Sequence, residues 1–207
     1  MYKVFVDNIS IYFQKDVIFK SNISSQYFPS ISIEDYDLFI NEVNNIQLTE
    51  KVFINCPDPK ETMLKLFSNF KWIEAAGGIV QNTTTKEVLF IFRNGFWDIP
   101  KGKIKKKENP RQGAIREIIE ECGLNELNIL SELSPTYHTY FAYGKHVIKK
   151  THWFVLETDD LDVQPEIEEG ITEVKWFEPN NFGVIRKNTF ASILDVMDEY
   201  LKNESNL

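Results

Sequence analysis

Residues 110–122 constrain the fold more than any other segment, because signals for the start and the end of a helix flank them on both sides. Asn109 suits a helix N-cap, Pro110 suits the first helical position, and Gly123 suits the left-handed residue just past the end. The predicted helix carries three glutamates at i, i+3 and i+4: Glu117, Glu120 and Glu121.

This spacing places the three carboxylates on one face of the helix, where like charges repel one another. Hard oxygen ligands gathered in this way suit Mg²⁺ or Mn²⁺, metals that commonly bridge a protein to substrate phosphates. A run of arginine and glutamates on a helix is also typical of a plain solvated face. The helix alone therefore leaves both interpretations open.

Apolar runs on both sides of this helix predict a domain of mixed helices and strands over residues 71–207. The expected strands are 73–80, 88–92, 97–99, 127–133, 136–143, 147–156 and 172–177. A second helix is expected over 188–202, with an apolar stripe formed by Phe190, Ile193, Leu194, Met197 and Leu201.

The first 70 residues form a separate pattern that we interpret as a small α+β unit. Two short apolar runs flank the turn pair Asp7-Asn8 and predict a hairpin. Helices are expected over 32–43 and 58–70, with a strand over 51–55 between them. No chemical motif is present, so the expected role is structural: packing against the larger domain, shaping the substrate rim or making a homodimer contact.

The composition excludes several classes of protein. The formal net charge is −8, which argues against a nucleic-acid partner. No apolar run is long enough to cross a bilayer, and the N-terminus lacks a signal-peptide pattern. The two cysteines form no disulfide or zinc pattern, so both are expected to be reduced and buried. A cytoplasmic protein without a membrane partner is predicted.

The segment around the glutamates resembles the Nudix box, G-x5-E-x7-R-E-U-x-E-E-x-G-U, in which U is a bulky aliphatic residue. Every fixed position of this pattern is matched, by Gly102, Glu108, Arg116, Glu117, Glu120, Glu121 and Gly123, and the two U positions are Ile118 and Leu124. A match of this length is far more specific than the helical glutamates by themselves.

The resemblance implies an α/β/α sandwich with a mixed sheet, preceded here by the small N-terminal unit. It implies that Glu120 and Glu121 bind Mg²⁺ or Mn²⁺, and that Glu117 is either a further ligand or the general base. The backbone carbonyl of Lys101 is a further candidate ligand. The implied reaction is attack of a metal-activated water on a phosphoanhydride bond.

Arg116 joins the catalytic set by the same resemblance and is expected to form an ion pair with Glu108 that holds the loop to the helix. Gly102, Glu108 and Gly123 are expected to be structural. A downstream acidic residue is expected to complete the metal site, and Glu169 is favoured over Glu168 and Glu173.

The substrate is expected to be a small nucleoside-diphosphate-linked compound. The sequence Pro100-Lys101-Gly102 is similar to the diadenosine-polyphosphate and diphosphoinositol branch of the family, which implies several phosphates near Lys101 and Lys103. Arg93 is a candidate phosphate contact and Tyr140 a candidate base-stacking residue. The alternatives are an ADP-sugar or 8-oxo-nucleotide hydrolase, or a non-catalytic Nudix module that binds a nucleotide to regulate another process.

Overall fold

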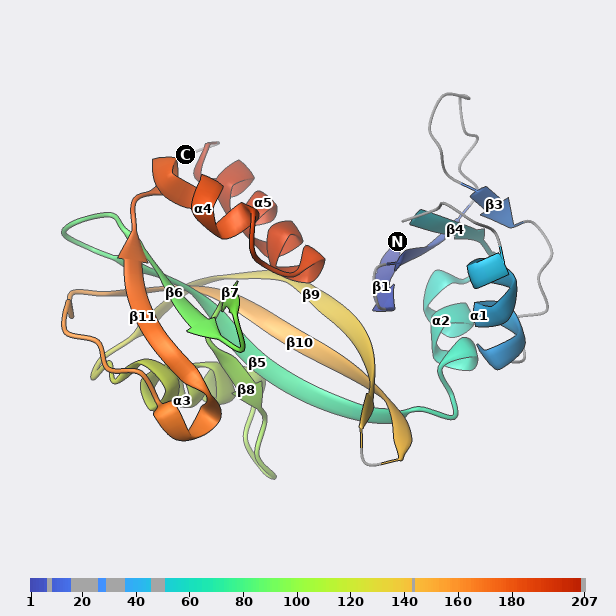
Figure 1. Ribbon diagram of the computed structural model, residues 1–207, viewed down its shortest axis with the longest axis horizontal. Coiled ribbons are helices and arrows are strands. Elements are labelled where there is room, and N and C mark those ends of the chain that lie inside the picture. The colour runs from blue at the N-terminus through green and yellow to red at the C-terminus, as the bar shows by residue number, and fades with distance from the viewer. Residues whose placement is uncertain (7–8, 16–25, 29–35, 46–50, 143, 206–207) are drawn as a thin grey trace. The chain divides into compact units, whose positions relative to one another are not determined.

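The computed structural model describes residues 1–6, 9–15, 26–28, 36–45, 51–142 and 144–205 (Figure 1). They form two compact units. The first consists of Met1–Trp72 with Tyr137–Lys149, and the second of Ile73–Thr136 with Lys150–Leu207. The division predicted at residue 70 did not assign residues 137–149 to the N-terminal unit. They belong there because Tyr137 and Ile148 are buried in its core.

The sheet of the first unit has the strand order β9–β1–β2–β4–β3. The strands are Tyr2–Val6 (β1), Ile9–Gln14 (β2), Gln26–Phe28 (β3), Lys51–Asn55 (β4) and the last part of Asn128–Ala142 (β9). The predicted hairpin is confirmed by the antiparallel pairing of β1 with β2, although its turn pair lies outside the described residues. β1 also pairs in parallel with β9, a contact between distant segments that no local pattern predicts.

Two helices complete the first unit: α1, Tyr36–Asn45, and α2, Pro59–Leu66. The predicted start of α1, residues 32–35, lies outside the described residues. α2 begins as predicted, because the Asp58 carboxylate accepts a hydrogen bond from the backbone N–H of Glu61 at 2.9 Å. It ends earlier than predicted, since the chain leaves the helix at Phe67 and then turns.

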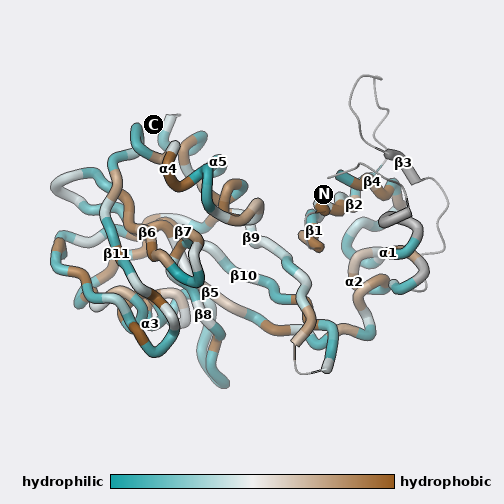
Figure 2. Tube along the Cα trace, viewed as in Figure 1, coloured by the Kyte–Doolittle hydropathy of each residue, from teal (hydrophilic) through white to brown (hydrophobic). Residues whose placement is uncertain are grey.

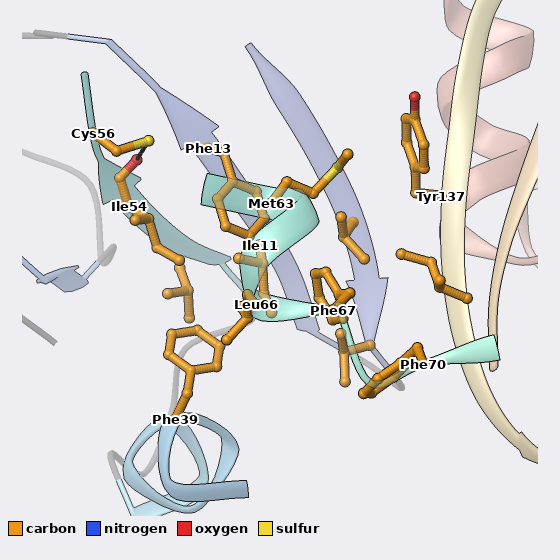
Figure 3. Packing of buried hydrophobic residues seen from close by; sticks show 14 residues of the cluster. Ile11, Phe13, Phe39, Ile54, Cys56, Met63, Leu66, Phe67, Phe70 and Tyr137 are labelled. Carbon is orange, nitrogen blue, oxygen red and sulfur yellow. Dashed lines mark hydrogen bonds between the residues drawn. The ribbon is translucent and has the colours of Figure 1, made fainter. Parts of the chain in front are cut away.

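The core of this unit is apolar and rich in phenylalanine (Figure 3). Met63 and Leu66, three residues apart on α2, point into it from the helix. Phe67 and Phe70 are buried in the same core, which explains why the chain turns after α2 instead of continuing as a helix. Their rings meet edge to face at 5.2 Å, a geometry that aromatic pairs favour.

The sheet of the second unit has the order β11–β6–β5–β10–β9, with β7 paired to β6 and β8 paired to β5. The new strands are Lys71–Asn82 (β5), Val88–Arg93 (β6), Phe96–Asp98 (β7), Lys101–Lys103 (β8), Lys145–Thr158 (β10) and Ile171–Phe177 (β11). β8 was not predicted, and the two segments expected over 127–133 and 136–143 form the single strand β9.

Helices cover both faces of this second sheet (Figure 1). α3, Pro110–Cys122, covers one face, while α4, Phe182–Arg186, and α5, Ala191–Glu204, cover the other. Successive residues of β6 from Val88 to Phe92 alternate between the two cores, so the strand is apolar up to its last residue, Arg93, as its colour in Figure 2 shows. The predicted α/β/α sandwich with a mixed sheet is confirmed.

The helix α5 differs in detail from its prediction. Its buried residues are Ile193, Val196, Met197 and Tyr200. Phe190 is 44% exposed because it is the N-cap and lies outside the helix.

In the described part of the chain, no helix is long and apolar enough to cross a membrane. Both cysteines are free and buried, as predicted.

Candidate active site

The helix α3 begins and ends where the sequence predicted. The Asn109 side chain accepts a hydrogen bond from the backbone N–H of Gln112 at 3.0 Å, and the Gln112 side chain accepts from that of Asn109 at 3.1 Å. At the other end, Gly123 is left-handed with φ 72° and closes the last turn. These caps fix which residues of α3 face the sheet and which face solvent.

The three glutamates do not share one environment. Glu117 and Glu121, one turn apart, are buried, whereas the side chain of Glu120 is 49% exposed. The spacing that the sequence predicted therefore does not give the three carboxylates equal exposure. Glu117 and Glu121 lie beneath the loop that precedes the helix, and Glu120 lies at the edge of the site.

The preceding loop packs directly on these carboxylates. A Cβ atom added to Gly102 would lie 1.9 Å from a carboxylate oxygen of Glu117, so any side chain here would displace that carboxylate. The backbone N–H of Lys101 donates a hydrogen bond of 2.8 Å to Glu121. β8 pairs with β5 opposite Ala76 and Gly77, which fixes this loop to the sheet.

Arg116 joins the loop to the helix. Its Nε and Nη2 donate two hydrogen bonds, of 2.7 and 2.8 Å, to the Glu108 carboxylate, and Nη2 also donates to the carbonyl of Lys103 at 3.0 Å. This two-bond geometry is the strong form of an arginine–carboxylate pair. Nη1 donates to Glu117 and to Glu120, each at 2.7 Å. One guanidinium therefore holds three carboxylates and the loop backbone.

A second network lies behind Glu121. Arg93 on β6 donates to Glu121 at 3.0 Å and to Asp98 at 3.4 Å. Asp98, which is 4% exposed, also accepts from the backbone N–H of Ile99 at 2.8 Å and from the side chain of Lys101. No role for Asp98 was predicted. The signal available in the sequence was an acidic residue inside an otherwise apolar strand, since such a charge needs a partner when buried.

Burial and the two arginines set different proton affinities for the carboxylates. Burial raises the pKa of Glu121 to about 7, against the opposing effect of Lys101 and Arg93, and burial also raises the pKa of Glu117. For Glu120, hydrogen bonds from Lys105 and Arg116 outweigh the effect of burial and lower the pKa. The hydrogen bonds from Arg116 lower the pKa of Glu108 to about 2.

The downstream acid favoured by the sequence lies near the same network. Glu169 ends the short helix η1, Ile167–Glu169, is 54% exposed, and has a carboxylate oxygen 3.8 Å from Arg93 Nη1. Glu121 and Glu169 thus share one guanidinium. Glu173 instead pairs with Lys175, which lies two residues along the same strand.

The oxygen-rich set of carboxylates fits the chemistry of Mg²⁺ or Mn²⁺, which prefer such ligands. Across the described ranges, however, no three acidic, histidine or cysteine side chains converge closely enough to hold a metal ion. Arg116 Nη1 contacts both Glu117 and Glu120, while Arg93 and the Lys101 N–H hold Glu121. The ligand set, including Glu169 and the Lys101 carbonyl, stays a prediction.

The residues predicted to contact the substrate belong to different units. Lys103 is exposed beside the Glu108–Arg116 pair, and Lys101 and Arg93 are held by Asp98. Tyr140 belongs to the first unit, where its ring stacks near His138 with a centroid distance of 6.1 Å. A base-stacking role for Tyr140 stays a prediction.

Several curated proteins are similar to part of this chain. An RNA pyrophosphohydrolase of Hamiltonella defensa is 31% identical over 103 residues, which cover 43% of this chain and 63% of that protein. An RNA pyrophosphohydrolase of Brucella ovis is 45% identical over 77 residues, covering 32% of this chain and 43% of that protein. The chain spans less than two thirds of the length of these relatives.

Solved structures with similar folds include the dihydroneopterin triphosphate pyrophosphohydrolase of E. coli, with a TM-score of 0.53, 19% identity, and coverage of 65% of this chain and 98% of that one. A Nudix hydrolase of M. smegmatis has a TM-score of 0.51 and 17% identity, covering 67% of this chain and 89% of that one. These likenesses show the fold. The family profile of the NUDIX domain matches residues 71–197, more than half of the chain. The chain therefore belongs to the Nudix family.

Proposed function

We propose that this protein is a metal-dependent hydrolase that cleaves a phosphoanhydride bond in a nucleoside-diphosphate-linked compound. The observation that carries the proposal is the packing of the loop on the glutamates. Gly102 leaves room for the Glu117 carboxylate, and the Lys101 N–H fixes Glu121. A methyl group on residue 102 would collide with the Glu117 carboxylate. Glycine at this position therefore fits a site that needs both the loop and the carboxylate in place.

Glu120 and Glu121 are the proposed ligands of Mg²⁺ or Mn²⁺, with Glu169 and the Lys101 carbonyl as additional candidates. When bound, the metal would neutralise phosphate oxygens and lower the pKa of a coordinated water. Glu120 suits this role because it is half-exposed at the site edge, and Glu121 because its carboxylate is fixed beside the loop.

Glu117 has two open roles, as a third ligand or as the group that accepts the proton of the attacking water. The two roles differ in a measurable way. If Glu117 is a ligand, Glu117→Gln weakens Mn²⁺ binding, which electron paramagnetic resonance measures directly. If it is the base, the variant keeps its Mn²⁺ affinity and loses turnover.

In this proposal, Arg116 and Asp98 position the catalytic carboxylates. Arg116 fixes the distance between α3 and the loop through Glu108 and the Lys103 carbonyl. Asp98 holds Arg93 and Lys101, the two cationic residues that contact Glu121. A positioned carboxylate loses less entropy when it binds, which favours a defined reaction geometry.

The substrate class follows from the charge of the loop. Lys103, Lys105, Lys106 and Lys107 are exposed in the loop before α3, where Lys105 pairs with Glu120 at 3.1 Å. Several cations in one loop favour a substrate with several phosphates, such as a dinucleoside polyphosphate. The relatives named RNA pyrophosphohydrolases support a second candidate, the 5′ polyphosphate end of an RNA. The substrate panel described below therefore also tests the prediction that nucleic acid is not a partner.

A smaller diphosphate, such as an ADP-sugar, or an 8-oxo-nucleotide is the alternative among enzymes, and a non-catalytic nucleotide-binding module is the alternative outside them. The buried Glu117 and Glu121 argue against a pure binder, because burying carboxylates is costly without a chemical use for them. We also propose a cytoplasmic location and a homodimer contact through the first unit.

The experiment is a panel of substrates with Mg²⁺ and with Mn²⁺, resolving products by phosphate position. It contains a dinucleoside polyphosphate, an RNA with a 5′ triphosphate, an ADP-sugar and an 8-oxo-nucleoside triphosphate. We expect release of a product cut at a phosphoanhydride, fastest for the first two. Binding without turnover on the whole panel would favour the regulatory module and contradict the proposal.

A further inference from the structure

The first unit contains a cavity of about 630 Å³ that its own residues line. Three segments form its wall: the start of α1, residues 69–71 at the junction of α2 and β5, and residues 144–146 at the start of β10. This volume is in the range of sites for small organic ligands, roughly 300–1,000 Å³. The Nudix motif does not explain it, because none of the lining residues belongs to the motif.

Aromatic rings form one side of the cavity. The ring of His146 stacks on Phe70, with centroids 5.0 Å apart and planes at 26°. Tyr36 meets Phe70 edge to face at 4.6 Å. Phe70 is buried in the core and therefore fixed, whereas the imidazole of His146 is exposed. A buried ring thus supports an exposed flat ring at the cavity wall.

This aromatic surface continues outward from the cavity. Phe141 is 66% exposed and meets the ring of His146 edge to face at 5.1 Å. A supported exposed ring is the arrangement on which bases stack. Stacking is tolerant of sequence because every base offers a flat face.

The polar residues of the cavity are suited to an anion. Lys71 and Lys145 are both exposed at its wall, against the single acidic residue Asp37. The local charge is thus positive although the whole chain has a net charge of −8. Asn69 adds an amide that can both donate and accept hydrogen bonds. The cavity therefore combines a stacking ring, two cations and polar groups for a ring edge.

We propose that this cavity binds a nucleoside phosphate, with its base stacked on His146 and its phosphate held by Lys71 and Lys145. The bound unit is either a free mononucleotide or the terminal nucleotide of a single strand, since both offer the same base and phosphate. The site is independent of hydrolysis at the glutamates and remains valid if the chain has no such activity.

The test uses the full chain and AMP in excess EDTA, which removes divalent ions from the glutamate site. Isothermal titration calorimetry gives the dissociation constant for the wild type, His146→Ala and the double variant Lys71→Ala/Lys145→Ala. We expect AMP to bind and His146→Ala to weaken it about 5- to 150-fold, the effect of losing one stacked base. The lysine variant should also reduce the salt dependence of binding.

Matched controls separate the site from general effects. Lys60→Ala removes an exposed lysine of α2 outside the cavity, and Glu120→Gln alters the candidate active site; neither should change AMP affinity. His146→Phe should retain binding because it keeps a flat ring. Thermal unfolding verifies that every variant is folded.

One further ligand identifies the source of the nucleotide. Tighter binding of a 5′-phosphorylated tetraadenylate than of AMP, again lost in His146→Ala, assigns the site to a strand end, and equal or weaker binding assigns it to free nucleotides. Absence of AMP binding at millimolar concentration, or equal affinity in the wild type and His146→Ala, would overturn the proposal.

Discussion

Both units have apolar cores, but they differ in the charged residues that they bury. The second unit buries charged residues, Glu117, Glu121 and Asp98, and satisfies them with arginines and backbone N–H groups. The core of the first unit is built from phenylalanines and aliphatic residues. Many apolar sequences can fill a core such as that of the first unit. The charged network of the second unit instead depends on particular residues at particular positions. A recognisable motif is therefore expected only in the second unit.

The largest effect is expected from removing the first unit's N-terminal segment. Deleting residues 1–70 would expose Tyr137 and Ile148, which are buried in the shared core, and would remove the strand paired with β9. We expect an aggregating or poorly stable protein, measured by size-exclusion chromatography and thermal unfolding. A truncated chain that stays soluble, monomeric and as stable as the full protein would show that the segment is an independent appendage.

The next effect concerns the charged network. Glu120→Gln and Glu121→Gln keep the side-chain size but remove a negative charge from the proposed metal site, and each should lower turnover roughly 10²-fold or more. Steady-state kinetics on the best substrate measures the loss. Glu126→Gln, an exposed glutamate just past α3, is the matched control and should keep wild-type rates. Normal turnover in both folded site variants would mean that the motif has no catalytic role here.

A smaller effect is expected at the loop. Gly102→Ala adds a Cβ atom 1.9 Å from the Glu117 carboxylate, which must move. We expect turnover to fall roughly 10-fold or more, since small misplacements in a catalytic site are costly. Gly183→Ala is the control, because a Cβ atom there meets no atom within 4 Å. Equal turnover in the two variants would dissociate the loop packing from function.

The smallest effect is on stability. Glu108→Gln weakens the two-bond pair with Arg116 and should destabilise the fold by about 1–3 kcal/mol at pH 7. The pKa of Glu108 in the folded protein, about 2, is below its ordinary value of 4.5. Its stabilising contribution is therefore complete above pH 4.5 and disappears as the pH falls toward 2. Thermal unfolding should show a difference between variant and wild type that shrinks over this interval; a constant difference would contradict the ion-pair explanation.

Local signals predicted α3 and the strands β1 and β4 with their bounds, because caps, turn residues and apolar runs act between neighbours in sequence. The pairing of Arg93 with Glu121 could not be predicted in this way, because the two residues are 28 positions apart and the sheet brings them together. The same limit applies to the pairing of Val4 with Tyr137. In the candidate site, the sequence thus identified the glutamates and the ion pair of Arg116 with Glu108, but not the contact of Arg93 with Glu121.

The most direct test of the proposed function is hydrolysis of the best substrate in excess chelator, followed by addition of Mg²⁺ or Mn²⁺. Carboxylates such as Glu120 and Glu121 are hard ligands and suit these ions. We predict that product formation stops in chelator and returns when either ion is restored, and that Glu120→Gln shows little recovery. Full turnover in excess chelator would contradict the proposal that this Nudix protein is a metal-dependent hydrolase.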